Sequence, residues 1–275
     1  MAEFYKVIAD IDELKYFYDK VLVKPEDGES IMICHSARAK RLTDEERKLL
    51  GTNRAEMFHT EVSKKRDKQE YTWIDFLSLI SKFEVNKNAY LTKANAVYPD
   101  KSLVNYIYMN PCSEAACAQD TLRQINVINK DLIDSALKGS TAGVKDSIWK
   151  LSTISNHIKA CHAQNPSRKV WIDFDIDIDA DFSQEIYDAV YKPTNELFGK
   201  GFFFLIKTAG GIHALVKKEK LKFNPDLYTE AVEKQLEFIG VKTKEVKKND
   251  NCMVPLPGTY QYGIPVVVLN KEDFS

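Results

Sequence analysis

Apolar and acidic residues alternate along residues 170–177, in the sequence VWIDFDID. An alternation with period two predicts a β-strand that buries one of its faces. Asp173, Asp175 and Asp177 are therefore expected on one side of the strand, with neighbouring side chains roughly 7 Å apart. Carboxylate oxygens are the ligands that Mg²⁺ prefers, so the pattern favours a divalent-cation site. The alternative is an edge strand whose exposed charges discourage aggregation.

The segments that follow this strand predict a compact α+β unit. Apolar residues recur at helical spacing or alternate at strand spacing, and Gly210-Gly211 marks a tight turn between two of the strands. The expected elements are helices at 183–198 and 226–239 and strands at 202–206, 212–216 and 264–269. Together they give the order β-α-β-β-α-β, the split βαβ or ferredoxin-like motif. We therefore expect helices on one face of a sheet and a ligand on the other.

The first half of the chain is more irregular. A strand is expected at 30–34, and a helix opens at Thr43, where Glu46 completes a capping box and Gly51 provides a stop. Further strands are expected at 89–91 and 103–109. The next four residues are Asn-Pro-Cys-Ser, in which Ser113 can cap a helix that runs to about residue 129. A strand that leads into a helix N-terminus can bind an anion, although capping alone also explains the serine. We divide the chain into a mixed α/β region at 1–85 and a second domain at 86–275.

Composition narrows the function classes. The chain has 275 residues, a formal net charge of −1 and a pI near 6.5, so any site for a polyanion must be a local patch. No apolar run approaches the ~20 residues of a membrane span, and no signal-peptide core is present at the N-terminus, so no membrane association is expected. The cysteines are odd in number and form no C-x-x-C pair, which fits reduced thiols and a cytoplasmic location. They are Cys34, Cys112, Cys117, Cys161 and Cys252.

Two further features have ordinary explanations. The helix expected at 144–164 carries His157, Cys161 and His162, which could approach one metal ion, but a zinc site needs a fourth ligand nearby. Helix packing is therefore the preferred interpretation. The basic run at residues 64–68 is interpreted as a solvated surface in preference to a phosphate contact.

Two motifs after the acidic strand point to phosphate chemistry. In Thr208-Ala209-Gly210-Gly211-Ile212-His213, adjacent glycines let backbone amides approach a ligand, and the imidazole of His213 could donate to a phosphate. Asp250 precedes a rigid loop that contains Pro257-Gly258-Thr259. Its carboxylate could complete a metal site with Asp173 and Asp175.

The chain resembles the archaeo-eukaryotic primase superfamily in the order of three motifs. They are the acidic strand, the glycine turn with its histidine, and the later Asp before Pro-Gly-Thr. The resemblance covers about residues 88–270 and is closest to the primase-polymerases of phages and mobile elements. It implies an α+β fold in which a split βαβ sheet carries the active site beside an N-terminal α/β subdomain.

The resemblance also implies roles for individual residues. Asp173 and Asp175 would bind catalytic Mg²⁺ or Mn²⁺, and Asp250 would complete that site, while Asp177 lies further toward the next helix. Candidates for contacts with the triphosphate are Lys207, Thr208, Gly210, Gly211 and His213. Two basic positions of the family are absent, because Cys112 replaces an Arg after Asn110-Pro111 and Val254 precedes Pro255; Lys247 or Lys248 could compensate.

The expected function is template-dependent nucleotidyl transfer from nucleoside triphosphates on single-stranded DNA, with two metal ions stabilising the attacking and leaving oxygens. The location would be the host cytoplasm if the chain is phage-encoded. The sequence has no G-x-x-x-x-G-K-[ST] motif, so unwinding would require a separate replicative helicase. A basic groove for the template is sought in Lys217, Lys218, Lys220 and Lys222. The alternatives are a metal-dependent nuclease on the same strand, a non-catalytic nucleic-acid-binding protein, and a degenerate primase-like protein with a regulatory role.

Overall fold

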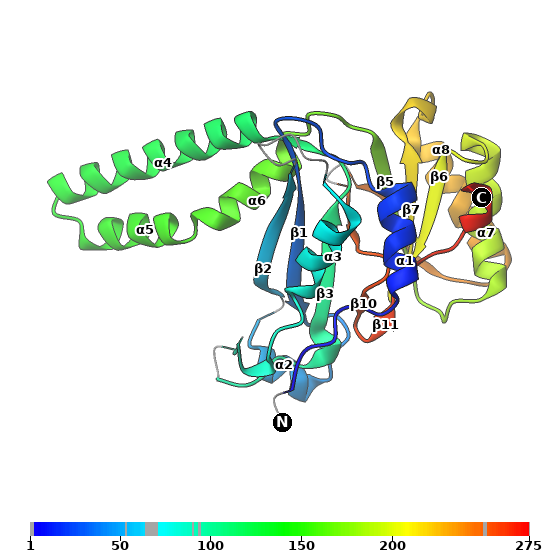
Figure 1. Ribbon diagram of the computed structural model, residues 1–275, viewed down its shortest axis with the longest axis horizontal. Coiled ribbons are helices and arrows are strands. Elements are labelled where there is room, and N and C mark those ends of the chain that lie inside the picture. The colour runs from blue at the N-terminus through cyan, green and yellow to red at the C-terminus, as the bar shows by residue number, and fades with distance from the viewer. Residues whose placement is uncertain are drawn as a thin grey trace.

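The computed structural model describes residues 3–52, 54–63, 71–89, 91–92, 95–249 and 252–274. Asp250 and the basic run at residues 64–68 lie outside these residues. The described chain has a mixed α+β fold with two antiparallel sheets, which confirms the expected class. An arm of helices projects from the side of the first sheet that is remote from the second (Figure 1).

The first sheet takes strands from both ends of the chain. Its main path runs β11-β10-β3-β1-β2, while β4 pairs with β1 and β9 pairs with β3. The strands are β1 (Glu29–Arg38), β2 (Arg54–Ser63), β3 (Leu103–Tyr108), β4 (Cys112–Ser113), β9 (Met253–Pro255), β10 (Tyr260–Gln261) and β11 (Ile264–Pro265). Strands from before and after residue 85 are therefore hydrogen-bonded to one another in a single sheet.

The second sheet contains the acidic strand and has the order β12-β6-β7-β5-β8. Its strands are β5 (Trp171–Ile178), β6 (Phe203–Lys207), β7 (Gly211–Lys217), β8 (Thr243–Asn249) and β12 (Val267–Val268). The expectation of one strand at 264–269 is wrong, because these residues are divided between β11 in the first sheet and β12 beside β6. The strand β5 lies between β7 and β8, and β8 is a charged edge strand in which only Val246 is buried.

The helices largely follow their capping signals. They are α1 (Ile11–Tyr16), α2 (Asp44–Leu50), α3 (Trp73–Ser81), α4 (Glu114–Leu137), α5 (Thr141–Ser152), α6 (Ile154–Gln164), α7 (Gln184–Phe198) and α8 (Pro225–Phe238). The capping box of Thr43 and Glu46 and the left-handed Gly51 are both present, and Ser113 caps α4 as expected. The single helix expected at 144–164 is instead two helices, α5 and α6, separated at Thr153. None of the helices in the described residues has the length and apolar character needed to cross a bilayer.

Two cores sandwich the second sheet. The even-numbered apolar residues of β5 pack beneath α7 and α8, together with Phe203, Leu205 and Ala214 from β6 and β7. The opposite face contributes Trp171, Phe204 and Leu215 to a core that is shared with the first sheet and α1. The aspartates of β5 alternate with the apolar set, so they occupy the face that is directed toward the first sheet.

Candidate active site

The acidic residues of β5 lie in the middle of the second sheet, with partners on both neighbouring strands. The residues of β7 opposite Asp173, Asp175 and Asp177 are, in that order, Leu215, His213 and Gly211. The residues of β8 opposite the same three aspartates are Asn249, Lys247 and Glu245. The register on β8 is interrupted just after Asp177. Such irregularities redirect side chains at the ends of strands and occur often beside active sites.

Asp173 is fully buried and makes the closest contact with the histidine. Nδ1 of His213 lies 3.0 Å from Oδ1 and 3.1 Å from Oδ2 of Asp173, and the amide of Asn249 donates to Oδ2 at 3.2 Å. Nε2 of His213 lies 3.5 Å from Oδ1 of Asp175. The imidazole is therefore placed between two carboxylates of one strand, and both oxygens of Asp173 already have partners.

The charges of His213 and the nearby aspartates affect one another's pKa values. Burial alone would lower the pKa of His213, but the carboxylates of Asp173, Asp175 and Asp177 raise it to about 9. The side chain is therefore an imidazolium at neutral pH and can donate from both nitrogens. Burial raises the pKa of Asp175, and the charges of Asp173 and Asp177 raise it further, against the opposing effect of His213.

The first sheet supplies cations that the sequence analysis missed. Nζ of Lys40, in the turn after β1, lies 3.0 and 3.1 Å from the two carboxylate oxygens of Asp177. The guanidinium of Arg38 lies 5.6 Å from the ring centre of Tyr106 and donates to its hydroxyl. The only local pattern that marks these residues is a group of three basic positions, 38, 40 and 41, at the end of β1. Their position beside the acidic strand depends on contact between the two sheets.

A hollow between the sheets lies over these groups. A cavity of about 130 Å³ is lined by Asp175, Asp177 and His213 from the second sheet and by Arg38 and Tyr262 from the first. It shares residues with a larger groove of about 650 Å³. The basic lining of that groove consists of Lys40, Arg41, Lys207 and Lys244. Three carboxylates, those of Asp177, Asp179 and Asp181, line the same groove, and Lys40 and Lys244 form ion pairs with two of them, so the groove carries a small excess of positive charge beside the imidazolium.

The glycine turn forms one wall of both hollows, but the amides of Thr208, Ala209 and Gly210 already have partners. The amide of Gly210 donates to Oγ of Thr208 at 3.3 Å, and the amide of Ala209 donates to Oε1 of Gln261 at 2.8 Å. A Cβ atom at Gly211 would lie 1.9 Å from the carbonyl oxygen of Ile176, so only glycine fits beside β5. Close packing of backbone against backbone explains this glycine without a ligand.

Other residues considered from the sequence lie elsewhere. Neither hollow is lined by the four lysines that were considered for a template groove, Lys217, Lys218, Lys220 and Lys222. Two of them lie over the ring of Phe202: Nζ of Lys217 is 5.5 Å from the ring centre, and Nζ of Lys220 is 3.6 Å from it. Lys207 does line the larger groove. Asp173 lines neither hollow and contacts His213. In the described residues, the carboxylates and imidazole of this site do not surround one point closely enough to form a ready-made metal site.

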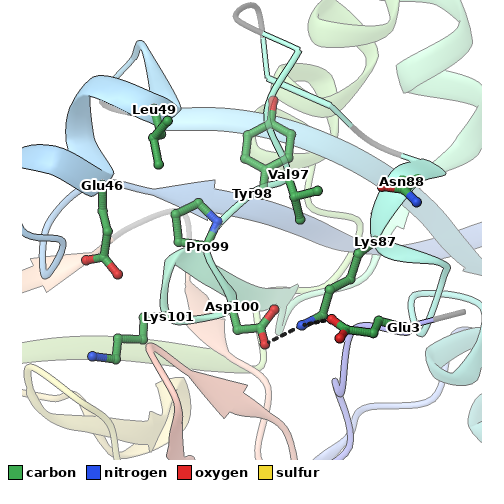
Figure 2. A pocket seen from close by; sticks show the side chains of 10 residues that line it. All are labelled: Glu3, Glu46, Leu49, Lys87, Asn88, Val97, Tyr98, Pro99, Asp100 and Lys101. Atoms are coloured by element: carbon green, nitrogen blue, oxygen red, sulfur yellow. Dashed lines mark hydrogen bonds and ion pairs between the residues drawn. The ribbon is translucent and has the colours of Figure 1, made fainter. Parts of the chain in front are cut away.

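A larger hollow of about 720 Å³ lies apart from the acidic strand (Figure 2). Its charged lining residues are Glu3, Glu46, Lys87, Asp100 and Lys101. Nζ of Lys87 lies 2.8 Å from Asp100 and 3.4 Å from Glu3, as Figure 2 shows. Two carboxylates thus already neutralise this cation. The hollow contains none of the convergent groups found on β5, so we consider the acidic site the stronger candidate.

No family model, curated protein or solved structure matches the chain. Its function is therefore inferred from the chemistry of the site.

Proposed function

We propose that the protein is a nucleotidyltransferase of the primase-polymerase type, which joins nucleotides from nucleoside triphosphates on a single-stranded DNA template. The observation that carries this proposal is the juxtaposition of Asp175 and protonated His213 with the groove whose basic lining residues include Lys40 and Arg41. Carboxylates suit divalent metal ions, and a row of cations suits the phosphates of a nucleotide.

The topology of the second sheet supports the same proposal. Omitting the edge strand β12, its order is β6-β7-β5-β8, and its two helices α7 and α8 cover one face. This agrees with a split βαβ sheet, in which the face without helices holds the ligand; here part of that face also packs against the first sheet. The hypothesis of a primase-polymerase also requires carboxylates on that face, where Asp173 and Asp175 lie.

The triphosphate is assigned to the larger groove. Lys40, Arg41 and Lys207 provide positive charge there, and the imidazolium of His213 provides a charge-assisted donor at the adjoining cavity. Lys40 is already held by Asp177 through a partly exposed ion pair, which a phosphate oxygen can share or replace. The negative ligand thereby compensates cations that the carboxylates of the groove only partly neutralise.

The donor set suits Mg²⁺ or Mn²⁺, because it offers hard carboxylate oxygens. Asp175, whose side chain is 43% exposed, is the most accessible ligand. Asp173 could share the ion if His213 gave up one of its contacts with the carboxylate. When bound, divalent ions would stabilise charge on the attacking and leaving oxygens. In nucleotidyl transfer, the role of the protein would be to hold the carboxylates and His213 in register on adjacent strands.

Tyr262 offers a further contact for the nucleotide. It lines the smaller cavity, and its buried hydroxyl has no hydrogen-bond partner among the described residues. Buried polar groups without partners are uncommon, because leaving one unpaired costs roughly 1–3 kcal/mol. We assign this hydroxyl to a polar group of the bound nucleotide.

The test is nucleotide incorporation on single-stranded DNA, with labelled nucleoside triphosphates and Mn²⁺ or Mg²⁺, with and without a primer. We expect the wild-type protein to extend the strand and Asp175→Asn to lose this activity. Asp188→Asn, at an exposed position of α7, is the matched control. Cleavage of DNA without nucleoside triphosphate would indicate a nuclease instead. DNA binding that survives Asp175→Asn, with no turnover by the wild type, would indicate a binding module.

A further inference from the structure

A second cluster of chemically reactive side chains lies at the base of the helical arm. It consists of Cys112 on β4, Cys117 in the first turns of α4 and His162 near the end of α6. All three are buried, and their candidate ligand atoms lie within 4.8 Å of one another. Sγ of Cys112 is 2.8 Å from Nδ1 of His162 and 3.8 Å from Sγ of Cys117.

Apolar packing explains only part of this arrangement. A buried thiol behaves as a small hydrophobic group, so cysteines alone could simply fill space. A 5% exposed imidazole is different, because its ring nitrogens must be paired when they leave water. Here Nδ1 is directed at a thiol, and two thiols and an imidazole are a typical ligand set for zinc. Cys161 packs into the same cluster and is 1% exposed.

We propose that Cys112, Cys117 and His162 bind a soft divalent metal ion, of which Zn²⁺ is the reference case. Cys161 packs beside them but lies outside the group whose ligand atoms are within 4.8 Å of one another, so it would become the fourth ligand only by moving closer on binding. This site is separate from the acidic strand and does not depend on the function proposed for that strand. On binding, each cysteine sulfur would lose its proton to solvent and form a metal–sulfur bond, and neutral His162 would coordinate through Nδ1.

The distances agree with a metal-free form of such a site. With a Zn–S bond of about 2.3 Å, two sulfurs of a tetrahedral site lie about 3.8 Å apart. This equals the observed Cys112–Cys117 separation of 3.8 Å. The sulfur and nitrogen ligands of such a site would lie about 3.6 Å apart. The contact between Cys112 and His162 would therefore lengthen from 2.8 Å, replacing a thiol–imidazole hydrogen bond with two metal bonds.

The position of the cluster suggests a structural role. The strand β4 pairs with β1 in the first sheet, whereas α4 and α6 are the two helices through which the arm joins that sheet (Figure 1). An ion held by all three elements would fix the base of the arm. The ligand set also explains a departure noted in the sequence, because Cys112 stands where the primase-like motif carries Arg.

The direct test is the metal content of protein purified without chelator from cells supplied with zinc. We expect one Zn²⁺ per chain, and we expect Co²⁺ substitution to give the charge-transfer and visible bands of a tetrahedral thiolate site. Cys112→Ser, Cys117→Ser and His162→Gln should each lose the ion, and Cys161→Ser should bind it more weakly. Cys34→Ala is the matched control, because Cys34 is a buried cysteine in a different cluster.

A measurement on the wild-type protein guards against variants that fail to fold. Removal of the ion with a chelator should lower the melting temperature by about 5 °C or more, and added Zn²⁺ should restore it. A wild-type protein that contains no metal and shows no thiolate bands with Co²⁺ would overturn the proposal. So would a Cys112–Cys117 disulfide in the purified protein, or an ion that persists in folded Cys112→Ser.

Discussion

Lys40 and Asp177 form an ion pair that joins the two sheets beside the glycine turn, with Nζ 3.0 Å from Oδ1. The two residues belong to different sheets and are distant in sequence. Their side chains are 50% and 27% exposed, so water screens the pair and its contribution to stability is small. Its importance is positional, because it holds a cation at the junction of the two hollows.

Replacement of this cation should weaken phosphate binding. We expect Lys40→Ala to raise the Kd for a nucleoside triphosphate about tenfold, equivalent to about 1.4 kcal/mol, because one cation is lost and Asp177 is left uncompensated. The affinity can be measured by calorimetry at two salt concentrations. Lys217→Ala, at the other end of the second sheet, should have little effect. Equal losses in both variants would contradict the assigned position of the phosphates.

Substitutions of Asp173 and of Asp175 should have different effects on stability. Asp175→Asn should abolish nucleotide incorporation with little change in stability, because its carboxylate faces the cavity. Asp173→Asn leaves His213 without its buried partner, and we expect it to cost about 3 kcal/mol of unfolding free energy as well as activity. Denaturant unfolding of the two variants separates these effects. If both variants unfold like the wild type, Asp173 does not position His213.

The charged state of His213 predicts a pH dependence of stability. Its folded-state pKa, about 9, is above the ordinary value of 6.5, so the stabilisation is complete below pH 6.5 and is lost as the pH rises through about 9. The free energy of unfolding of the wild type should therefore fall over this window relative to His213→Gln, by about 3 kcal/mol. Parallel stability profiles for the two proteins would show that the imidazole titrates normally.

The glycine turn offers a test of backbone packing. Gly211→Ala should destabilise the protein by about 3 kcal/mol or more, because its Cβ would overlap the carbonyl oxygen of Ile176. Gly210→Ala is the comparison, since its Cβ would lie 3.1 Å from a side-chain oxygen of Asp177, which can move. Thermal unfolding of the two variants should rank Gly211→Ala as clearly the less stable. A reversed order would contradict the packing described for this turn.

The sequence predicted well those features that depend on neighbours along the chain. The alternation in β5, the turn before His213 and the capping box at Thr43 are local patterns, so their elements could be placed within a few residues. The strand β8 was missed because its lysines and glutamate leave almost no apolar alternation. Conversely, the apolar run after Gly263 indicated one strand, although its short pieces pair in two different sheets.

The site itself could be predicted only in part. Asp175 and His213 lie on adjacent strands of one unit, so their proximity agrees with the expected split βαβ order, although their register was not predicted. The contribution of Arg38 and Lys40 could not be anticipated, because it requires the packing of one sheet on the other. The same limit applies to His162, which was considered with ligands from its own helix and instead meets Cys112 and Cys117 from other elements.

The return of the chain to the first sheet has a consequence for biosynthesis. The strand β3 pairs with β9 and β10, which belong to the last part of the chain, and Val268 donates its amide to Glu13 near the start. The ribosome must therefore release the chain to beyond residue 261 before this sheet can close. Until then, β3 presents an unpaired edge to the cell, a state that favours aggregation and chaperone binding.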